Sequence, residues 1–61
     1  MMITIKREWL DQCGYQHIMQ REYRVIEVLP HRLPDGRRIF VVDLNGRPWH
    51  VAEWRCETIT D

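Results

Sequence analysis

The chain lacks three things: an excess of charge of either sign, enough cysteine for a disulfide framework, and a long apolar run. Its 61 residues include nine basic and nine acidic side chains, which excludes a general attraction to nucleic acid or to anionic membrane. Its two cysteines are too few to staple a small secreted fold. With no signal peptide and no membrane-length segment in view, we expect a protein of the reducing cytoplasm.

Lysine is scarce as well, because Lys6 is the only one and the other eight basic residues are arginine. Arginine is the better planar, bidentate partner for carboxylates, phosphates and aromatic rings, although a GC-rich genome produces the same bias. The length predicts a single domain, residues 1–61, with one small core and little room for a deep active site.

The clearest structural pattern is the run Arg38–Leu44 followed by Asn45-Gly46. The run is short, β-branched and aromatic, and turn residues bound it on both sides, so it predicts a strand. Asn-Gly predicts a two-residue type I′ turn, because both central residues need positive φ. This turn pairs Phe40 with Val51. The resulting apolar face carries Phe40, Val42, Leu44, Trp49 and Val51.

A second turn, Leu33-Pro34-Asp35-Gly36, precedes this strand. Proline sets φ for the first central position of a turn, and glycine takes the left-handed position that follows. If Leu33 pairs with Arg37, Val28 faces Val42 and Ile26 faces Leu44. Both then lie on the apolar face that the Asn-Gly turn selects.

This register has one unfavourable feature, since it sets like charges opposite each other. Glu27 faces Asp43, and Arg32 faces Arg38. Such pairs are mildly destabilising, so we expect a bulge near His31 or a charge from a partner to relieve them.

The rest of the chain supplies shorter elements. Residues 2–5 predict a strand, residues 6–13 a short helix that ends at Gly14, and residues 55–60 a last strand after a turn. Residues 16–21 show no period, which leaves helix and loop open. The strand over residues 22–30 is apolar on both sides, so we expect the helix that carries Trp9, or a partner subunit, to cover its second face.

These elements predict a mainly β fold: a small SH3-like barrel, or a three- to five-stranded antiparallel meander with one short N-terminal helix. A three-stranded sheet backed by one helix is the next alternative. If residues 15–29 were helical instead, the element order would resemble the miniature winged-helix proteins of phage excisionases. The resemblance rests on Ile3-Thr4-Ile5, on Trp9 and on Asp35-Gly36-Arg37-Arg38. It implies a DNA-binding regulator, but the β-branched residues among 25–28 favour a strand.

Two thiols and two imidazoles are enough in number for a tetrahedral zinc site. The spacings from Cys13 to His17 and from His50 to Cys56, however, are those of neither a zinc finger nor a knuckle. We therefore expect both cysteines to be small core residues, and we expect no metal or other cofactor. Cys13 with a histidine as nucleophile and base has no visible oxyanion hole or orienting group, so we expect no catalysis.

The candidate binding residues are Arg32, Arg37, Arg38 and Trp54. The three arginines crowd the ends of the Pro-Asp-Gly turn, and only Asp35 offsets them locally. A basic hairpin tip suits a nucleic-acid groove or an acidic protein surface, although an ordinary solvated loop has the same charges. Trp54 follows the last well-defined strand and is the ring most expected to be exposed. Arginine and tryptophan are both enriched at binding hot spots.

We therefore expect a small non-enzymatic protein-binding module that acts as a regulator or inhibitor. Free-standing chains of this size often come from phages and other mobile elements, and a homodimer is one possible state. The alternative is a nucleic-acid-binding regulator, excisionase-like or SH3-like, that uses the basic hairpin tip. Nucleic-acid binding should weaken steeply with added salt, whereas a largely apolar protein interface should respond much less.

Overall fold

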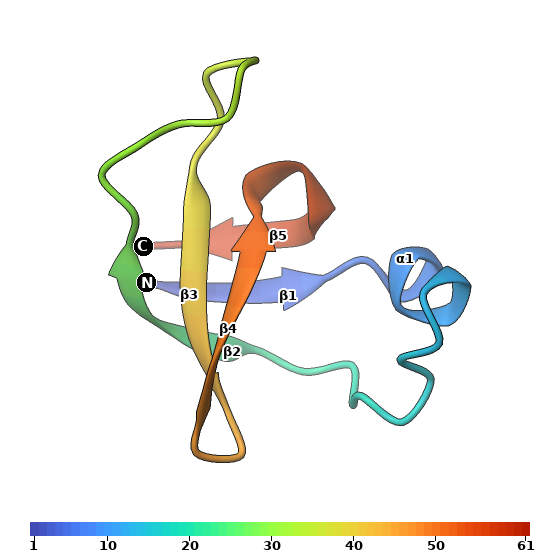
Figure 1. Cartoon of the computed structure of the whole chain (residues 1–61). Coiled ribbons are helices and arrows are strands. Elements are labelled where there is room, and N and C mark those ends of the chain that lie inside the picture. The colour runs from blue at the N-terminus through green and yellow to red at the C-terminus, as the bar shows by residue number, and fades with distance from the viewer.

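The computed structural model describes all residues, 1–61, and confirms a mainly β chain (Figure 1). In chain order its elements are β1 (Met2–Ile5), α1 (Arg7–Gln12), β2 (Tyr23–Val28), β3 (Ile39–Leu44), β4 (Arg47–Ala52), the 3₁₀ helix η1 (Glu53–Arg55) and β5 (Cys56–Thr60). The five strands form one antiparallel sheet in the order β4-β3-β2-β1-β5.

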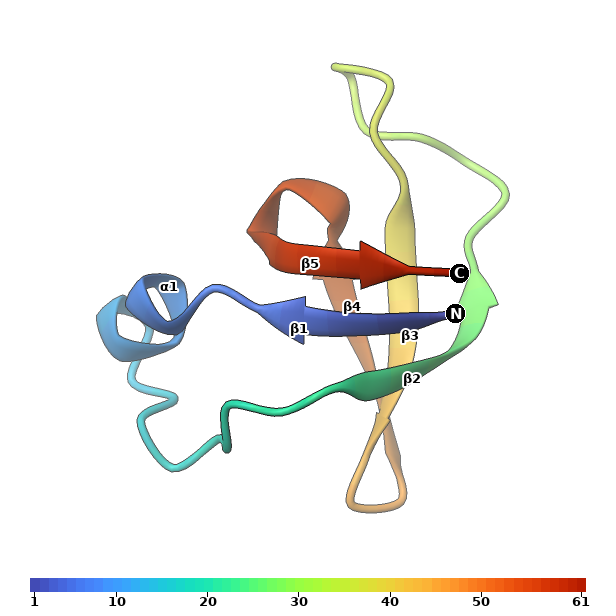
Figure 2. The ribbon, with the colours of Figure 1, turned by 180° about the vertical axis from the view of Figure 1, so that it is seen from behind.

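The sheet is bent, so that one part of it packs over the other. β3 and β4 run across β1 and β5 when the molecule is seen from either side (Figures 1 and 2). β2 joins the two parts, because residues 23–24 pair with β1 and residues 25–28 pair with β3. The buried cluster consists of Ile3, Ile5, Leu10, Ile18, Tyr23, Phe40, Val42, Val51 and Cys56.

The hairpin of β3 and β4 confirms the prediction from Asn45-Gly46. Phe40 lies opposite Val51, and all the other pairs follow the same register. Asn45 has φ of 53° and Gly46 has φ of 84°, as a type I′ turn requires. Trp49 is half-buried and packs against the core, so its ring belongs to the apolar face as expected.

The predicted register between β2 and β3 is wrong. Val28 lies opposite Phe40 instead of Val42, and Val25 takes the place opposite Val42. The Pro-Asp-Gly turn itself does form, because the Leu33 amide donates to a carbonyl four residues later at 2.9 Å. The error therefore arises between the turn and the strands.

Two irregularities change the register. The Leu29 amide donates to the carbonyl of Ile39 at 3.0 Å, which leaves residues 30–32 opposite a single residue of the other side. A second irregularity falls at Ile26, between Val25 and Glu27. The first irregularity places Glu27 opposite Val41, so Glu27 no longer faces Asp43, and the second places Val25 opposite Val42.

As a result, β2 turns a different face to the core. Tyr23 is buried and Val25 packs against the core, whereas Ile26 and Val28 are 55% and 40% exposed. The second face, which was expected to need a cover, therefore forms part of the core, and Trp9 of α1 stacks on Trp49 of β4. The face that was expected to lie in the core is the exposed one.

The N-terminal helix forms as predicted. The six residues of α1 are too few for a stable isolated helix, so burial of Leu10 in the core is what holds it. It ends before Gly14, whose φ of 81° suits glycine. Residues 13–22 form turns and Tyr23–Val28 is a strand, so the winged-helix alternative is wrong. No helix is long and apolar enough to span a membrane.

Candidate functional site

The arginine tip projects beyond β3, away from α1 (Figures 1 and 2). Arg32 and Arg37 are exposed there, as the sequence predicts. The Nη1 of Arg32 donates to the carbonyl of Gly36 at 3.2 Å, and the Nε of Arg37 lies 3.6 Å from a carboxylate oxygen of Asp35. Local contacts therefore neutralise part of the positive charge at the tip.

The third arginine of the tip, Arg38, is held in place by Glu53 of η1. The Nη2 and Nε of Arg38 donate to the carboxylate at 3.3 Å each, and its backbone amide donates at 2.9 Å. These hydrogen bonds lower the pKa of Glu53, and the same carboxylate raises the pKa of Arg38. The guanidinium also lies 5.0 Å from the ring centre of Phe40. Arg38 therefore fastens the tip to η1.

Three rings from different parts of the chain form an aromatic cluster: Trp9 of α1, Tyr15 of the following loop and Trp49 of β4. Trp9 stacks on Trp49 with ring centres 5.9 Å apart, and Tyr15 meets Trp49 edge-on at 5.6 Å. Trp9 and Tyr15 are 6.0 Å apart. Such offset and edge-on contacts are the favourable geometries for ring pairs. The cluster anchors α1 against the sheet.

A groove between α1 and η1 lies beside this cluster. Its volume is about 190 Å³, and it is lined by Lys6, Glu8, Trp9, Gln12, Trp54 and Arg55. The guanidinium of Arg55 lies between two indoles, 4.4 Å from the ring centre of Trp9 and 3.9 Å from that of Trp54. The amide of Lys6 donates to the carbonyl of Arg55 at 3.0 Å, which ties the two walls together. We call this feature the α1–η1 groove.

Arg7 fixes the loop that follows α1. Its Nη1 donates to the carbonyl of Ile18 at 2.6 Å, its Nη2 to that of Tyr15 at 3.1 Å, and its Nε to Asp11 at 3.1 Å. The planar fork of arginine allows these contacts together, which a lysine does not. Arg7 therefore positions Tyr15 beside the groove.

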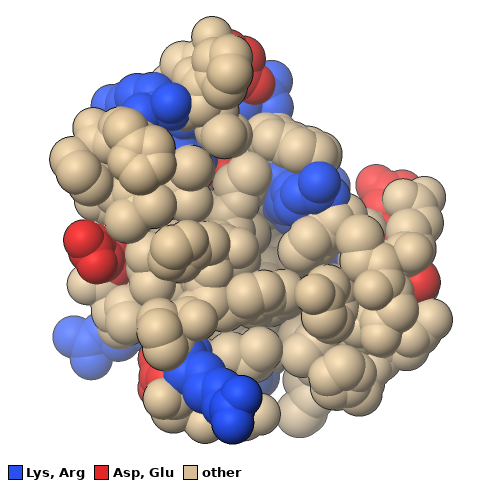
Figure 3. Space-filling model, viewed as in Figure 1, with Lys and Arg blue, Asp and Glu red and all other residues tan.

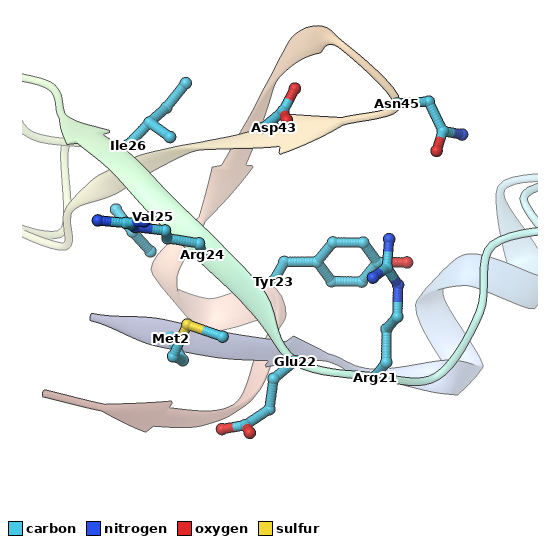
Figure 4. Close-up of a pocket in the computed structure, with 9 residues that line it drawn as sticks. All are labelled: Met2, Arg21, Glu22, Tyr23, Arg24, Val25, Ile26, Asp43 and Asn45. Carbon is cyan, nitrogen blue, oxygen red and sulfur yellow. The ribbon is translucent and has the colours of Figure 1, made fainter.

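The largest hollow on the surface, about 710 Å³, lies along β2 and the tip of the β3–β4 hairpin (Figure 4). Arg21 lies over the ring of Tyr23, at 4.7 Å from its centre. Arg24 points the other way, and Asp43 lies across the hollow from both (Figure 4). Because these polar groups diverge, the hollow has no set of groups aimed at one ligand.

The thiols and imidazoles do not form a site. Cys56 is buried, and burial together with the negative charge of Glu53 raises the pKa of its thiol to about 11. Cys13 is exposed, so its predicted place in the core is wrong. No group of three or more histidine, cysteine, aspartate or glutamate side chains is placed to hold a metal ion.

Comparisons with models of known protein families, with characterised proteins and with solved structures found no significant match to this chain. Of the predicted site residues, three arginines meet at the tip, whereas Trp54 places its ring in the α1–η1 groove. Sequence reasoning missed Arg55. The adjacent pair Trp54-Arg55 was a visible signal, but its contact with Trp9 depends on pairing across the whole chain.

Proposed function

We propose that this chain is a small non-enzymatic protein-binding module, a regulator or inhibitor of its partner, that binds through the α1–η1 groove. Trp54 carries the proposal, because its large side chain is 41% exposed although it lies against Arg55. Exposed tryptophan and arginine side by side are the residues most enriched at protein hot spots. The groove is also smaller than the roughly 300–1,000 Å³ typical of small-molecule sites, so it suits a few side chains of a partner.

We also propose that the bent five-stranded sheet is an SH3-like barrel. The strand order β4-β3-β2-β1-β5 and the bend of the sheet support it. So does the single 3₁₀ turn between the last two strands. In this arrangement α1 and the loop after it form a long connection between β1 and β2, and that connection lines the binding groove.

A nucleic-acid partner has less support. Two of the three tip arginines contact carboxylates, and the formal net charge is zero. On the face that carries β3 and β4, charged side chains are scattered, with uncharged surface between them (Figure 3). A nucleic-acid surface needs a continuous positive patch to neutralise several phosphates.

The experiment is a selection of peptides from a random library displayed on phage, with the whole chain immobilised. An enriched peptide is then synthesised, and its affinity is measured for the wild type and for Trp54→Ala. Ile26→Ala is the matched control, because Ile26 is also an exposed apolar side chain but lines the hollow along β2 and not the groove. We expect roughly thirtyfold or greater weakening for Trp54→Ala, since hot-spot truncations commonly cost about 2 kcal/mol or more, and no change for the control.

A third variant separates the groove from the tip. Arg32→Ala with Arg37→Ala removes the exposed tip charges and leaves the Arg38 contact with Glu53 intact. We expect this double variant to bind the peptide normally. If it loses binding while Trp54→Ala does not, the working surface is the tip. If no peptide is enriched, or if every variant binds equally, the groove is not a protein-binding site.

A further inference from the structure

Arg55 is the one arginine whose guanidinium lies over two aromatic rings. The arginines within ion-pair distance of a carboxylate are Arg7, Arg37 and Arg38. Arg55 has no such partner, and its side-chain N–H groups make no hydrogen bond within the protein. It is nevertheless half-buried, held between the indoles of Trp9 and Trp54. Its position is therefore set by stacking, and its donors remain free.

Stacking determines which part of the guanidinium is free to bind. A guanidinium is planar, and its N–H donors all lie in the plane of the group. A ring that stacks on the flat face of a guanidinium leaves its donor edge open. A fork of donors in one plane matches the two oxygens of a carboxylate, and such charged, bidentate hydrogen bonds are about twice as strong as neutral ones. The two indoles hold the guanidinium of Arg55 in place, and its donors make no hydrogen bond within the protein, so they are free to bind an anion.

We propose that the α1–η1 groove binds an aspartate or glutamate side chain of a protein partner. The guanidinium of Arg55 donates two parallel hydrogen bonds to the carboxylate of that side chain. The inference rests on the proposed function and names the chemistry of the partner. Lys6 lines the same groove and supplies a second cation, against one carboxylate from Glu8. Trp54 offers an exposed ring next to Arg55, so the partner places an apolar side chain beside its acidic one.

Two observations favour a protein carboxylate over a phosphate of nucleic acid. The groove holds about 190 Å³, which is room for a side chain but less than small-molecule sites usually provide. Glu8 on the rim repels a dianion or a polyanion more than it repels a single carboxylate.

The test compares two peptide libraries of the same length, one with all residue types and one without aspartate and glutamate. We expect binders that depend on Trp54 from the first library only. A peptide from it, with an amidated C-terminus, is then compared with its Glu→Gln or Asp→Asn counterpart. The counterpart should bind the wild type roughly ten- to a hundredfold more weakly, because a charged hydrogen-bonded pair is lost.

Arg55→Lys tests the same contact from the protein side. It keeps the charge but loses the fork and the stacking, so binding should fall about tenfold or more. It should also reduce the difference in affinity between the acidic peptide and its amide counterpart, because the charge stays but the second hydrogen bond is lost. Arg47→Lys is the control, because Arg47 is an exposed arginine of the β3–β4 hairpin with no ion pair. The comparison of the acidic peptide with its amide counterpart uses the wild-type protein. It therefore tests carboxylate recognition even if Arg55→Lys is unstable.

Two results overturn the inference in different ways. If peptides bind through Trp54 but the Glu→Gln or Asp→Asn change does not alter their affinity, the groove binds proteins but does not recognise a carboxylate. If no peptide depends on Trp54, the groove itself fails and the inference fails with it. Displacement of the peptide by single-stranded DNA at low salt, but not by an acidic peptide, would show that the site prefers phosphate.

Discussion

At the scale of single residues, Phe40 contributes most to the core. It is the largest side chain that is buried completely, and it is the only phenylalanine. Phe40→Ala should cost about 3 kcal/mol or more, because it leaves a cavity in a core with few large side chains. A chain of this length has a total stability of roughly 0.05–0.15 kcal/mol per residue, so the variant should be largely unfolded at moderate urea. An unchanged urea midpoint of unfolding would show that Phe40 is not a core residue.

The two cysteines should differ sharply in reactivity. The thiolate is the reactive form, and burial raises the pKa of Cys56 to about 11, so its thiol stays protonated at neutral pH. Cys13 is exposed. With a soluble thiol reagent at pH 8, one thiol should react at once and the second only after denaturant is added. Mass mapping should place the first label on Cys13. Prompt labelling of Cys56 in the folded protein would contradict its burial.

At the scale of elements, β2 shows where sequence reasoning reached its limit. The β3–β4 register was predictable, because a two-residue turn fixes which residues of the two strands face each other. The connection from β2 to β3 spans residues 29–38, and its extra residues can be taken up in several ways. The bulge at Ile26 has no sequence signal of its own. The irregularity over residues 30–32 separates Glu27 from Asp43, which the simple register would have set opposite each other.

A pair of substitutions in β2 tests this correction. Val25 packs against the core, whereas Ile26 is 55% exposed. Val25→Ala should therefore lower the free energy of unfolding by about 1 kcal/mol. Ile26→Ala should change it by no more than about 0.5 kcal/mol. Urea unfolding of both variants is the measurement. The opposite ranking would restore the register that the sequence predicted.

The contact between Arg38 and Glu53 joins the β2–β3 connection to η1, and it should make stability depend on pH. The folded state lowers the pKa of Glu53, so it binds fewer protons there than the unfolded state does. The stabilisation is present above the ordinary glutamate pKa of about 4.3 and is lost as the pH falls through the lower folded value. Glu53→Gln should flatten the decline of the melting temperature between about pH 5 and pH 3. An identical decline in both proteins would show that the contact does not form in solution.

At the scale of the whole molecule, the general architecture could be predicted from the sequence, whereas the α1–η1 groove could not. Alternating apolar residues and turn chemistry indicate a small antiparallel β fold with one short helix, because both are local patterns. The α1–η1 groove brings Trp9 next to Trp54 and Arg55, and that contact depends on β1 pairing with β5. Pairing between the two ends of a chain leaves no local pattern. The sequence could therefore single out Trp54 as exposed but not name its neighbours.

The most direct test of the groove is photo-crosslinking in the native cells. A photoreactive amino acid is placed at Gln12, which is exposed and lines the groove, and in a second variant at Arg37 on the tip. We expect irradiation to capture a protein partner from Gln12, with the adduct lost when Trp54→Ala is added, and nothing from Arg37. A protein or nucleic-acid adduct that forms from Arg37 and never from Gln12 would contradict the account.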